Sequence, residues 1–170
     1  DQTFAAIFTP TDTANYNVIE KTLTVEVADS VTHPAKPTIN VTGTYTYTGS
    51  DITATVDGYD AATMNITGNV GKNVATYTVS VTSKTGQWAD STTEAVTATW
   101  KIDKADPAYT IPTGLTGVKG KALSTVALTA GWTWKTPEAV MDTVGDQTFA
   151  AIFTPTDTAN YNVIEKTLTV

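Results

Sequence analysis

The sequence predicts an all-β protein built from β-sandwich modules that are arranged end to end along the chain. Three observations support this prediction. Apolar and polar residues alternate with a period of two in several segments, which is the pattern of a strand with one buried face. No window repeats apolar residues at helical spacing over three turns. Threonine, which favours strands, accounts for 38 of the 170 residues.

The clearest predicted strands are residues 75–81 and 96–102, where apolar side chains alternate with threonine or serine for most of the length. Residues 52–56 and 19–27 show the same alternation, although Lys21 interrupts the second one. Stretches with turn residues, such as "VDGYD" and "TGNVGKN", separate the predicted strands. Short strands with turn signals between them are typical of a sandwich or a barrel.

Residues 1–25 and residues 146–170 have the same sequence, DQTFAAIFTPTDTANYNVIEKTLTV; we call them the first copy and the second copy. We expect each copy to form the last two strands of an A-type module. A lone hairpin is marginal in water, so we expect the first copy to be completed by sequence outside this chain or by a neighbouring molecule. The predicted inward residues are Phe4, Phe8, Ile19, Leu23 and Val25 in the first copy, and Phe149, Phe153, Ile164, Leu168 and Val170 in the second.

The repeat predicts three parts in the chain. Residues 1–29 are the C-terminal hairpin of a preceding A-type module, residues 37–103 are a B-type module, and residues 107–170 are a nearly complete A-type module. The joins "VADSVTHPAKP" and "KIDKADP" are polar and contain proline, which stops a sheet from running through. Aligning Val144 with Val70 brings the inward residues of the two modules into register, so we interpret them as diverged copies of one fold.

Composition narrows the choice of partners. The net charge is −7, the isoelectric point is near 4.4, and all ten cationic Lys/Arg residues are lysines. This balance argues against nucleic acid and against anionic membrane surfaces, both of which attract basic proteins. The sequence contains no run of about 18 apolar residues, so we expect no membrane insertion of this segment. Cysteine is absent, so Lys–Asn crosslinks through Lys101 or Lys166 stay open as a substitute for disulfides.

The sequence carries no catalytic signature, and we expect neither an enzyme nor a cofactor. His33 is the only histidine and lies in a predicted linker. A zinc site therefore lacks a second histidine or a cysteine, and a Ser-His-Asp triad lacks an oriented partner for His33. No metal site is predicted. Asp57 and Asp60 in "VDGYD" could bind calcium weakly, but aspartates that bond their own backbone in a turn are the favoured interpretation.

The sequence contains four tryptophans and two sequon asparagines that are candidates for a binding or modification site. Trp132 and Trp134 lie on one face of a predicted strand, where they either stack on sugars or fill the core; the core is favoured, as it is for Trp100. Trp88, in "TGQWADS", lacks an obvious inward partner and is the candidate contact to a ligand or an adjoining module. The candidate glycosylation sites are Asn40 in "NVT" and Asn65 in "NIT".

The segments "NVATYTVSVT", "GTYTYTGSDITATVDGYD" and "TATWKIDKADP" resemble the MBG- and YDG-type immunoglobulin-like tandem repeats of large bacterial surface proteins. Residues 107–170 look like a companion repeat found in similar proteins, so the resemblance covers nearly the whole chain. It implies tandem immunoglobulin-like sandwiches that lie at the cell surface, outside the cell. Their implied partners are neighbouring repeats of the same protein, and a filament is one arrangement of such repeats. The resemblance brings no functional residues with it.

Two hypotheses about function follow from the resemblance. The first is a structural tandem-repeat segment of a cell-surface stalk, an adhesin or an extracellular fibre. The alternative is a ligand-binding adhesin module that recognises a carbohydrate or a protein through loops such as "TGQWADS" or "TPTDTANYN".

Overall fold

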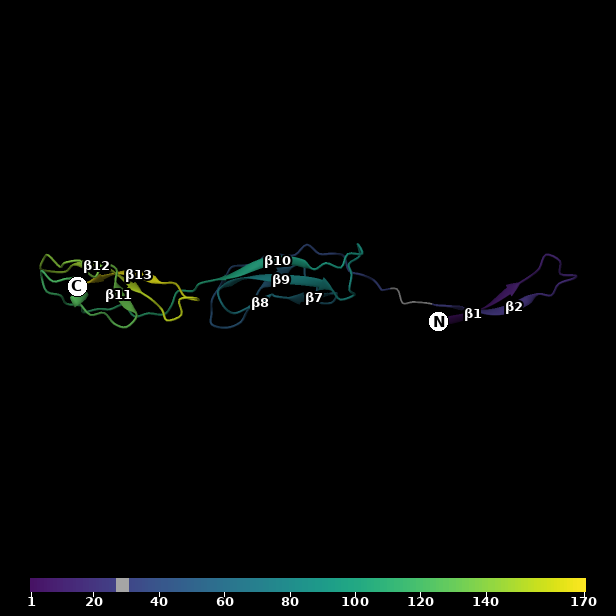
Figure 1. The fold of residues 1–170 in the computed structure, drawn as a ribbon, viewed down its shortest axis with the longest axis horizontal. Helices are drawn as coiled ribbons and strands as arrows, with labels where there is room; N and C mark the ends of the chain where they lie inside the picture. The colour runs from purple at the N-terminus through teal and green to yellow at the C-terminus, as the bar shows by residue number, and fades with distance from the viewer. Residues whose placement is uncertain (27–30) are drawn as a thin grey trace.

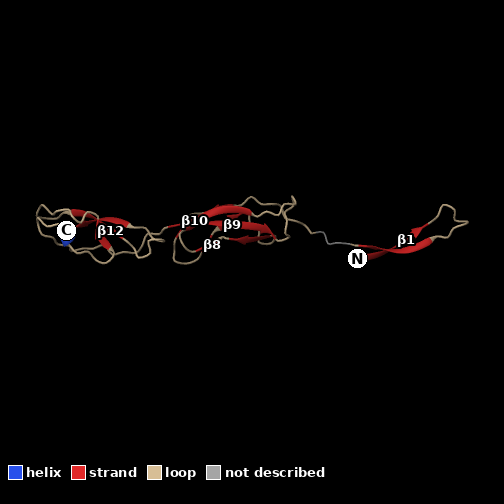
Figure 2. Ribbon diagram, viewed as in Figure 1, coloured by secondary structure: helices blue, strands red, loops and turns tan. Residues whose placement is uncertain are grey.

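The computed structural model describes residues 1–26 and 31–170. Regular structure in these ranges is β throughout, apart from η1, a single 3-10 turn at Leu123–Thr125. Figure 2 shows the strands and loops, with that turn as the one helical element of the described chain. The prediction of an all-β chain without a helix longer than a turn is therefore confirmed for the described residues.

The first copy forms a separate antiparallel hairpin of β1 (Gln2–Phe8) and β2 (Ile19–Val25). Phe4 lies opposite Leu23, and Phe8 lies opposite Ile19. Every residue of the two strands except Ala6 is exposed, so no other part of the described chain covers this hairpin. Residues 27–29 of the first predicted part lie outside the described residues.

The middle segment, residues 31–103, contains one larger sheet and two small ones. The larger sheet has the order β4-β10-β9-β7, in which β10 runs parallel to β4 and antiparallel to β9. The small sheets are β3-β6 and β5-β8. The bounds are β3 (Asn40–Thr42), β4 (Tyr45–Thr46), β5 (Ile52–Thr53), β6 (Thr55–Asp57), β7 (Met64–Thr67), β8 (Val70–Gly71), β9 (Ala75–Ser83) and β10 (Val96–Asp103).

The strand predicted at residues 52–56 is divided in the structure. Ala54 separates β5 from β6, and the two halves pair with different strands, β8 and β3. The predicted inward side of this stretch is still correct, because Ala54 is buried and its neighbours Ile52 and Val56 are half-buried. The alternation therefore predicted which side chains turn inward, although it did not predict the switch in pairing partner.

Two apolar clusters form the core of the middle segment. Trp100 and Ile102 pack with Ala54 in one cluster, and Tyr77 stacks on Trp100 with ring centroids 4.8 Å apart. The other cluster holds Met64, Val81 and Trp88. Both clusters draw on β9 or β10, as the period-two pattern of these strands predicts.

The C-terminal segment, residues 107–170, has a three-stranded antiparallel sheet in the order β11-β12-β13. The strands are β11 (Trp132–Trp134), β12 (Thr148–Phe153) and β13 (Ile164–Thr169). Irregular chain and η1 cover one side of this sheet and contribute Leu123 and Val126 to its core. The middle and C-terminal segments follow one another along the long axis of the molecule (Figure 1).

Candidate functional site

The loop between β12 and β13, residues 154–163, binds the short connection between the middle and C-terminal segments. We call the contact of residues 154–163 with residues 104–106 and with the middle segment the joint. The backbone N–H of Ala105 donates to the carbonyl of Asn160 at 3.1 Å, and the N–H of Asn162 donates to the carbonyl of Ala105 at 2.8 Å. The Lys104 ammonium donates to the Thr158 carbonyl at 2.6 Å, so side-chain and backbone bonds both fix the connection.

Two side chains of the loop reach past the connection to the middle segment. Asn160 is only 8% exposed, and its Oδ1 accepts a hydrogen bond from the backbone N–H of Val74 at 2.9 Å. Tyr161 contacts Tyr47 edge to face, with ring centroids 5.2 Å apart. A buried polar group with its bonds satisfied and an aromatic pair together favour one arrangement of the two segments over others.

Asp157 organises the loop from within. Its carboxylate accepts hydrogen bonds from the Asn160 side chain at 2.9 Å and from the Asn160 backbone N–H at 3.1 Å. The side-chain bond from Asn160 is the main cause that lowers the pKa of Asp157 below its usual range. Asp157 is therefore ionised at neutral pH and holds Asn160 in the position that meets Val74.

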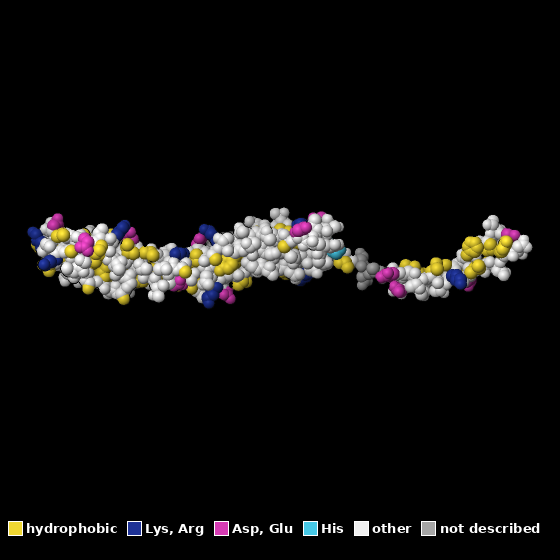
Figure 3. All heavy atoms as spheres, in the orientation of Figure 1, with side chains coloured by type: hydrophobic (Ala, Val, Ile, Leu, Met, Phe, Trp, Pro, Cys, Tyr) yellow, Lys and Arg dark blue, Asp and Glu magenta, His cyan; other side chains and the backbone are white. Residues whose placement is uncertain are grey.

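A second surface is the apolar face of the N-terminal hairpin. Phe4 is 50% exposed, Phe8 65% and Leu23 54%. Figure 3 shows yellow hydrophobic side chains along this part of the molecule. The hairpin loop is also free, since Tyr16, the counterpart of Tyr161, is 67% exposed. The apolar face and the loop of this hairpin are therefore both exposed in the described chain.

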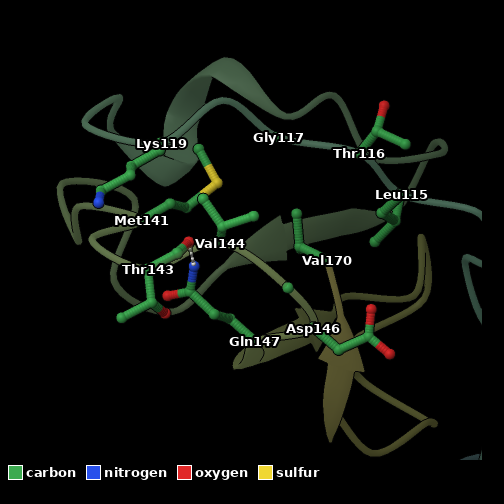
Figure 4. Close-up of a pocket in the computed structure, with 11 residues that line it drawn as sticks. Leu115, Thr116, Gly117, Lys119, Met141, Thr143, Val144, Asp146, Gln147 and Val170 are labelled. Atoms are coloured by element: carbon green, nitrogen blue, oxygen red, sulfur yellow. Dashed lines mark hydrogen bonds between the residues drawn. The ribbon is translucent and has the colours of Figure 1, made fainter.

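A shallow groove of about 270 Å³ lies at residues 115–119 and 141–147 of the C-terminal segment (Figure 4). Its apolar lining consists of Leu115, Met141, Val144 and Val170. The Gln147 side chain donates to the Thr143 carbonyl at 2.7 Å beside it. Its lining offers one cation, Lys119, and one anion, Asp146.

The tryptophans are all core residues. Trp132 and Trp134 are buried, as Trp100 is, which confirms the favoured interpretation for these three. Trp88 differs from its prediction: it is 1% exposed, packs on Met64 and Val81, and donates its indole N–H to the Glu94 carbonyl at 2.9 Å. Its inward partners Met64 and Val81 lie on β7 and β9, and this burial removes Trp88 as a surface contact to a ligand or an adjoining module.

The remaining predicted residues lie at the surface. Asn40 on β3 and Asn65 on β7 are exposed, so both glycosylation candidates are accessible. Asp60 accepts hydrogen bonds from the Ala62 N–H and the Thr63 hydroxyl, in agreement with the turn interpretation, while Asp57 is exposed at the end of β6.

The single histidine is more than a spacer. His33 exchanges hydrogen bonds with Thr85 at 2.8 Å and with Gln87 at 2.7 Å, which ties the start of the middle segment to the loop after β9. Of the two crosslink candidates, Lys101 pairs with Asp103, and Lys166 is exposed. Among residues 1–26 and 31–170, no group of three His, Cys, Asp or Glu side chains is placed to hold a metal ion.

The joint is the feature that sequence reasoning missed. Its signal in the sequence is the loop "TPTDTANYN", which occurs in both copies and which suggests a loop for recognising a ligand when the sequence is taken alone. No helix in the described part of the chain has the length and apolar character needed to cross a bilayer. Comparison with protein-family models, with curated proteins and with solved structures finds no match.

Proposed function

We propose that this chain is a structural segment of an extracellular, cell-surface stalk, adhesin or fibre, built from tandem immunoglobulin-like modules. In this proposal residues 37–103 form a B-type module, residues 107–170 form an A-type module, and residues 1–25 supply the closing strands of another A-type unit. The observation that carries the proposal is the joint, in which residues 154–163 bind both the connection and the adjacent module.

A stalk must hold consecutive modules in line, and the joint has the features for that task. A glycine- and serine-rich linker would behave as a flexible coil. Here Ala105 instead donates one backbone hydrogen bond to the loop and accepts another from it, and Asp106 accepts a further bond from the Asn162 side chain at 2.7 Å. The negative net charge opposes self-association of such a rod in solution.

The alternative of a ligand-binding module receives less support. Its two candidate loops are residues 85–91 and residues 154–162. The aromatic of the first loop, Trp88, is turned into the core, and the second loop is engaged in the joint. The resemblance to surface-protein repeats, together with the recurrence of the joint sequence in the first copy, favours the structural role.

Small-angle X-ray scattering of the full chain tests this function. We expect a rod-like profile, and we expect Asn160→Ala to broaden the distribution of maximum dimensions, while Asn15→Ala leaves it unchanged. A compact, near-spherical particle formed by the middle and C-terminal segments would overturn the proposal. A glycan array probed with the full chain provides the second arm, because saturable binding of one glycan would assign the chain to the adhesin class with a recognition role instead.

A further inference from the structure

The two copies of the sequence form the same hairpin. Phe4 lies opposite Leu23 in the first copy, and Phe149 lies opposite Leu168 in the second. The same correspondence holds along both strands, up to Phe8 opposite Ile19 and Phe153 opposite Ile164. The second copy therefore shows what surroundings this hairpin accepts.

Residues 107–145 cover the apolar face of the second copy. Trp134 contacts Phe149 at a centroid distance of 6.2 Å, and Trp132 contacts Phe153 at 5.5 Å. Leu168 is 2% exposed in a cluster that includes Leu123 and other residues of the covering segment. The cover is thus specific, because aromatic rings contact the two phenylalanines and the leucine is buried in the same cluster.

The same segment also pairs with the edge of the hairpin. β11 adds to β12 with Trp132 opposite Phe153 and Thr133 opposite Ile152, so β12 is paired on both sides. Within the described residues, β1 is paired only with β2. Its outer edge presents unpaired backbone N–H and C=O groups beside an exposed apolar face, and such an edge accepts an added strand.

We propose that the apolar face of the N-terminal hairpin and the free edge of β1 are a docking surface for a polypeptide segment with the sequence of residues 107–145. That segment adds a Trp-Thr-Trp strand to β1 and places its two tryptophans over Phe4 and Phe8. The surface would bind this partner whether or not the chain serves as a stalk.

A second intact copy of the chain is a poor occupant for this surface. Its residues 107–145 are already covered by its own second copy, which is held at high effective concentration by the covalent chain. Because the two hairpins have identical sequences, exchanging one for the other gains no contact. The partner is therefore an uncovered segment of this sequence, and not the folded C-terminal segment.

Titration of the full chain with a synthetic peptide of residues 107–145 tests the proposal by calorimetry. We expect saturable binding of one peptide per chain. Leu23→Asp should weaken this binding by at least about tenfold, because it places a charge in the covered face. The matched control is Thr22→Asp on the opposite face of β2, which corresponds to the exposed Thr167 and should leave the affinity unchanged.

Disulfide trapping tests the register independently, because the chain contains no cysteine. A peptide carrying Thr133→Cys should form a disulfide with the Ile7→Cys chain under oxidised glutathione, since Ile7 corresponds to Ile152, the partner of Thr133. The Thr3→Cys chain should form none, because its counterpart Thr148 lies outside the pairing with β11.

Three results would overturn the docking surface. The first is absence of saturable binding, and the second is equal trapping by the cysteines at positions 3 and 7. The third is self-association of the peptide-free full chain that Leu23→Asp abolishes, seen by sedimentation velocity, because the occupant would then be a second copy. Any of these results would leave the rod shape and the role as a stalk to be judged by scattering.

Discussion

The first and second copies of the repeated sequence form the same hairpin in the same register, but they differ in what surrounds them. Leu23 is 54% exposed, whereas Leu168, at the same place in the second copy, is 2% exposed. Tyr16 is 67% exposed, whereas Tyr161 packs on Tyr47. Local sequence therefore determines strand pairing and the turn, while burial is determined by residues that lie outside the repeat.

The loop shows the same division between local and distant causes. In the first copy the Asp12 carboxylate accepts bonds from the Asn15 side chain at 2.8 Å and its N–H at 3.2 Å, much as Asp157 does from Asn160. The turn is thus formed without its partner. What the first copy lacks is the acceptor surface, which the middle segment supplies to the second copy.

The largest expected difference between the copies concerns the leucines. Leu168→Ala should lower the free energy of unfolding of the C-terminal segment by about 2–5 kcal/mol, because it leaves a cavity in the core. Leu23→Ala should change stability by less than about 0.5 kcal/mol, because the side chain is exposed. Guanidinium unfolding followed by tryptophan fluorescence measures Leu168→Ala. Because the first copy contains no tryptophan, amide hydrogen exchange in β1 and β2 measures Leu23→Ala. Equal losses would mean that the first copy is covered in solution as well.

A glycine in the covering segment sharpens the comparison. Gly131 has a φ of +86°, and a Cβ there would lie 2.6 Å from the Phe153 ring. Gly120 has a similar φ of +82°, but a Cβ there meets only open space. Gly120→Ala should cost about 1–2 kcal/mol from backbone strain alone, and Gly131→Ala should cost about 1–3 kcal/mol more from overpacking. Equal costs in thermal unfolding would show that the Phe153 ring moves aside freely.

How much of this could be predicted from sequence depends on how far apart the partners lie. The period-two pattern predicted the strands at residues 75–81 and 96–102 and the burial of Val79 and Val81, because side-chain alternation is a local property. The joint depends on partners far along the chain. Asn160 meets Val74 across 86 residues, and no local pattern marks such a pair.

The two asparagines of the repeated loop should differ less than the leucines do. Asn160→Ala removes the acceptor for the Val74 N–H and should cost about 1–3 kcal/mol. Asn15→Ala should cost less than about 0.5 kcal/mol, because its loop touches no partner in the described chain. Amide hydrogen exchange detects the difference directly, with faster exchange expected at Val74 only in Asn160→Ala. Unchanged protection at Val74 would assign no role in the joint to Asn160.

The smallest expected effect is a pH dependence of the joint. Hydrogen bonds from Asn15 and Asn160 lower the pKa values of Asp12 and Asp157 in the folded chain below the ordinary 3.8. A lowered carboxyl pKa stabilises the folded form above the ordinary value, and this contribution is lost as the pH falls through the lowered folded-state value.

Acidification should therefore weaken the hydrogen bonds of Asn15 to Asp12 and of Asn160 to Asp157 alike. Only in the second copy should this also weaken a contact with the middle segment, the bond from the Val74 N–H to Asn160. Below pH 3.8 we expect protection of the Val74 amide to fall, after correction for the intrinsic exchange rate, while protection of Trp132 and Trp134 in β11 is retained. Asp157→Asn should make the protection of Val74 independent of pH in this range, and Asp12→Asn should leave the wild-type dependence in place. If both variants behave like the wild type, the Asp157 carboxylate does not hold the joint, and its contacts with Asn160 serve only the shape of the turn.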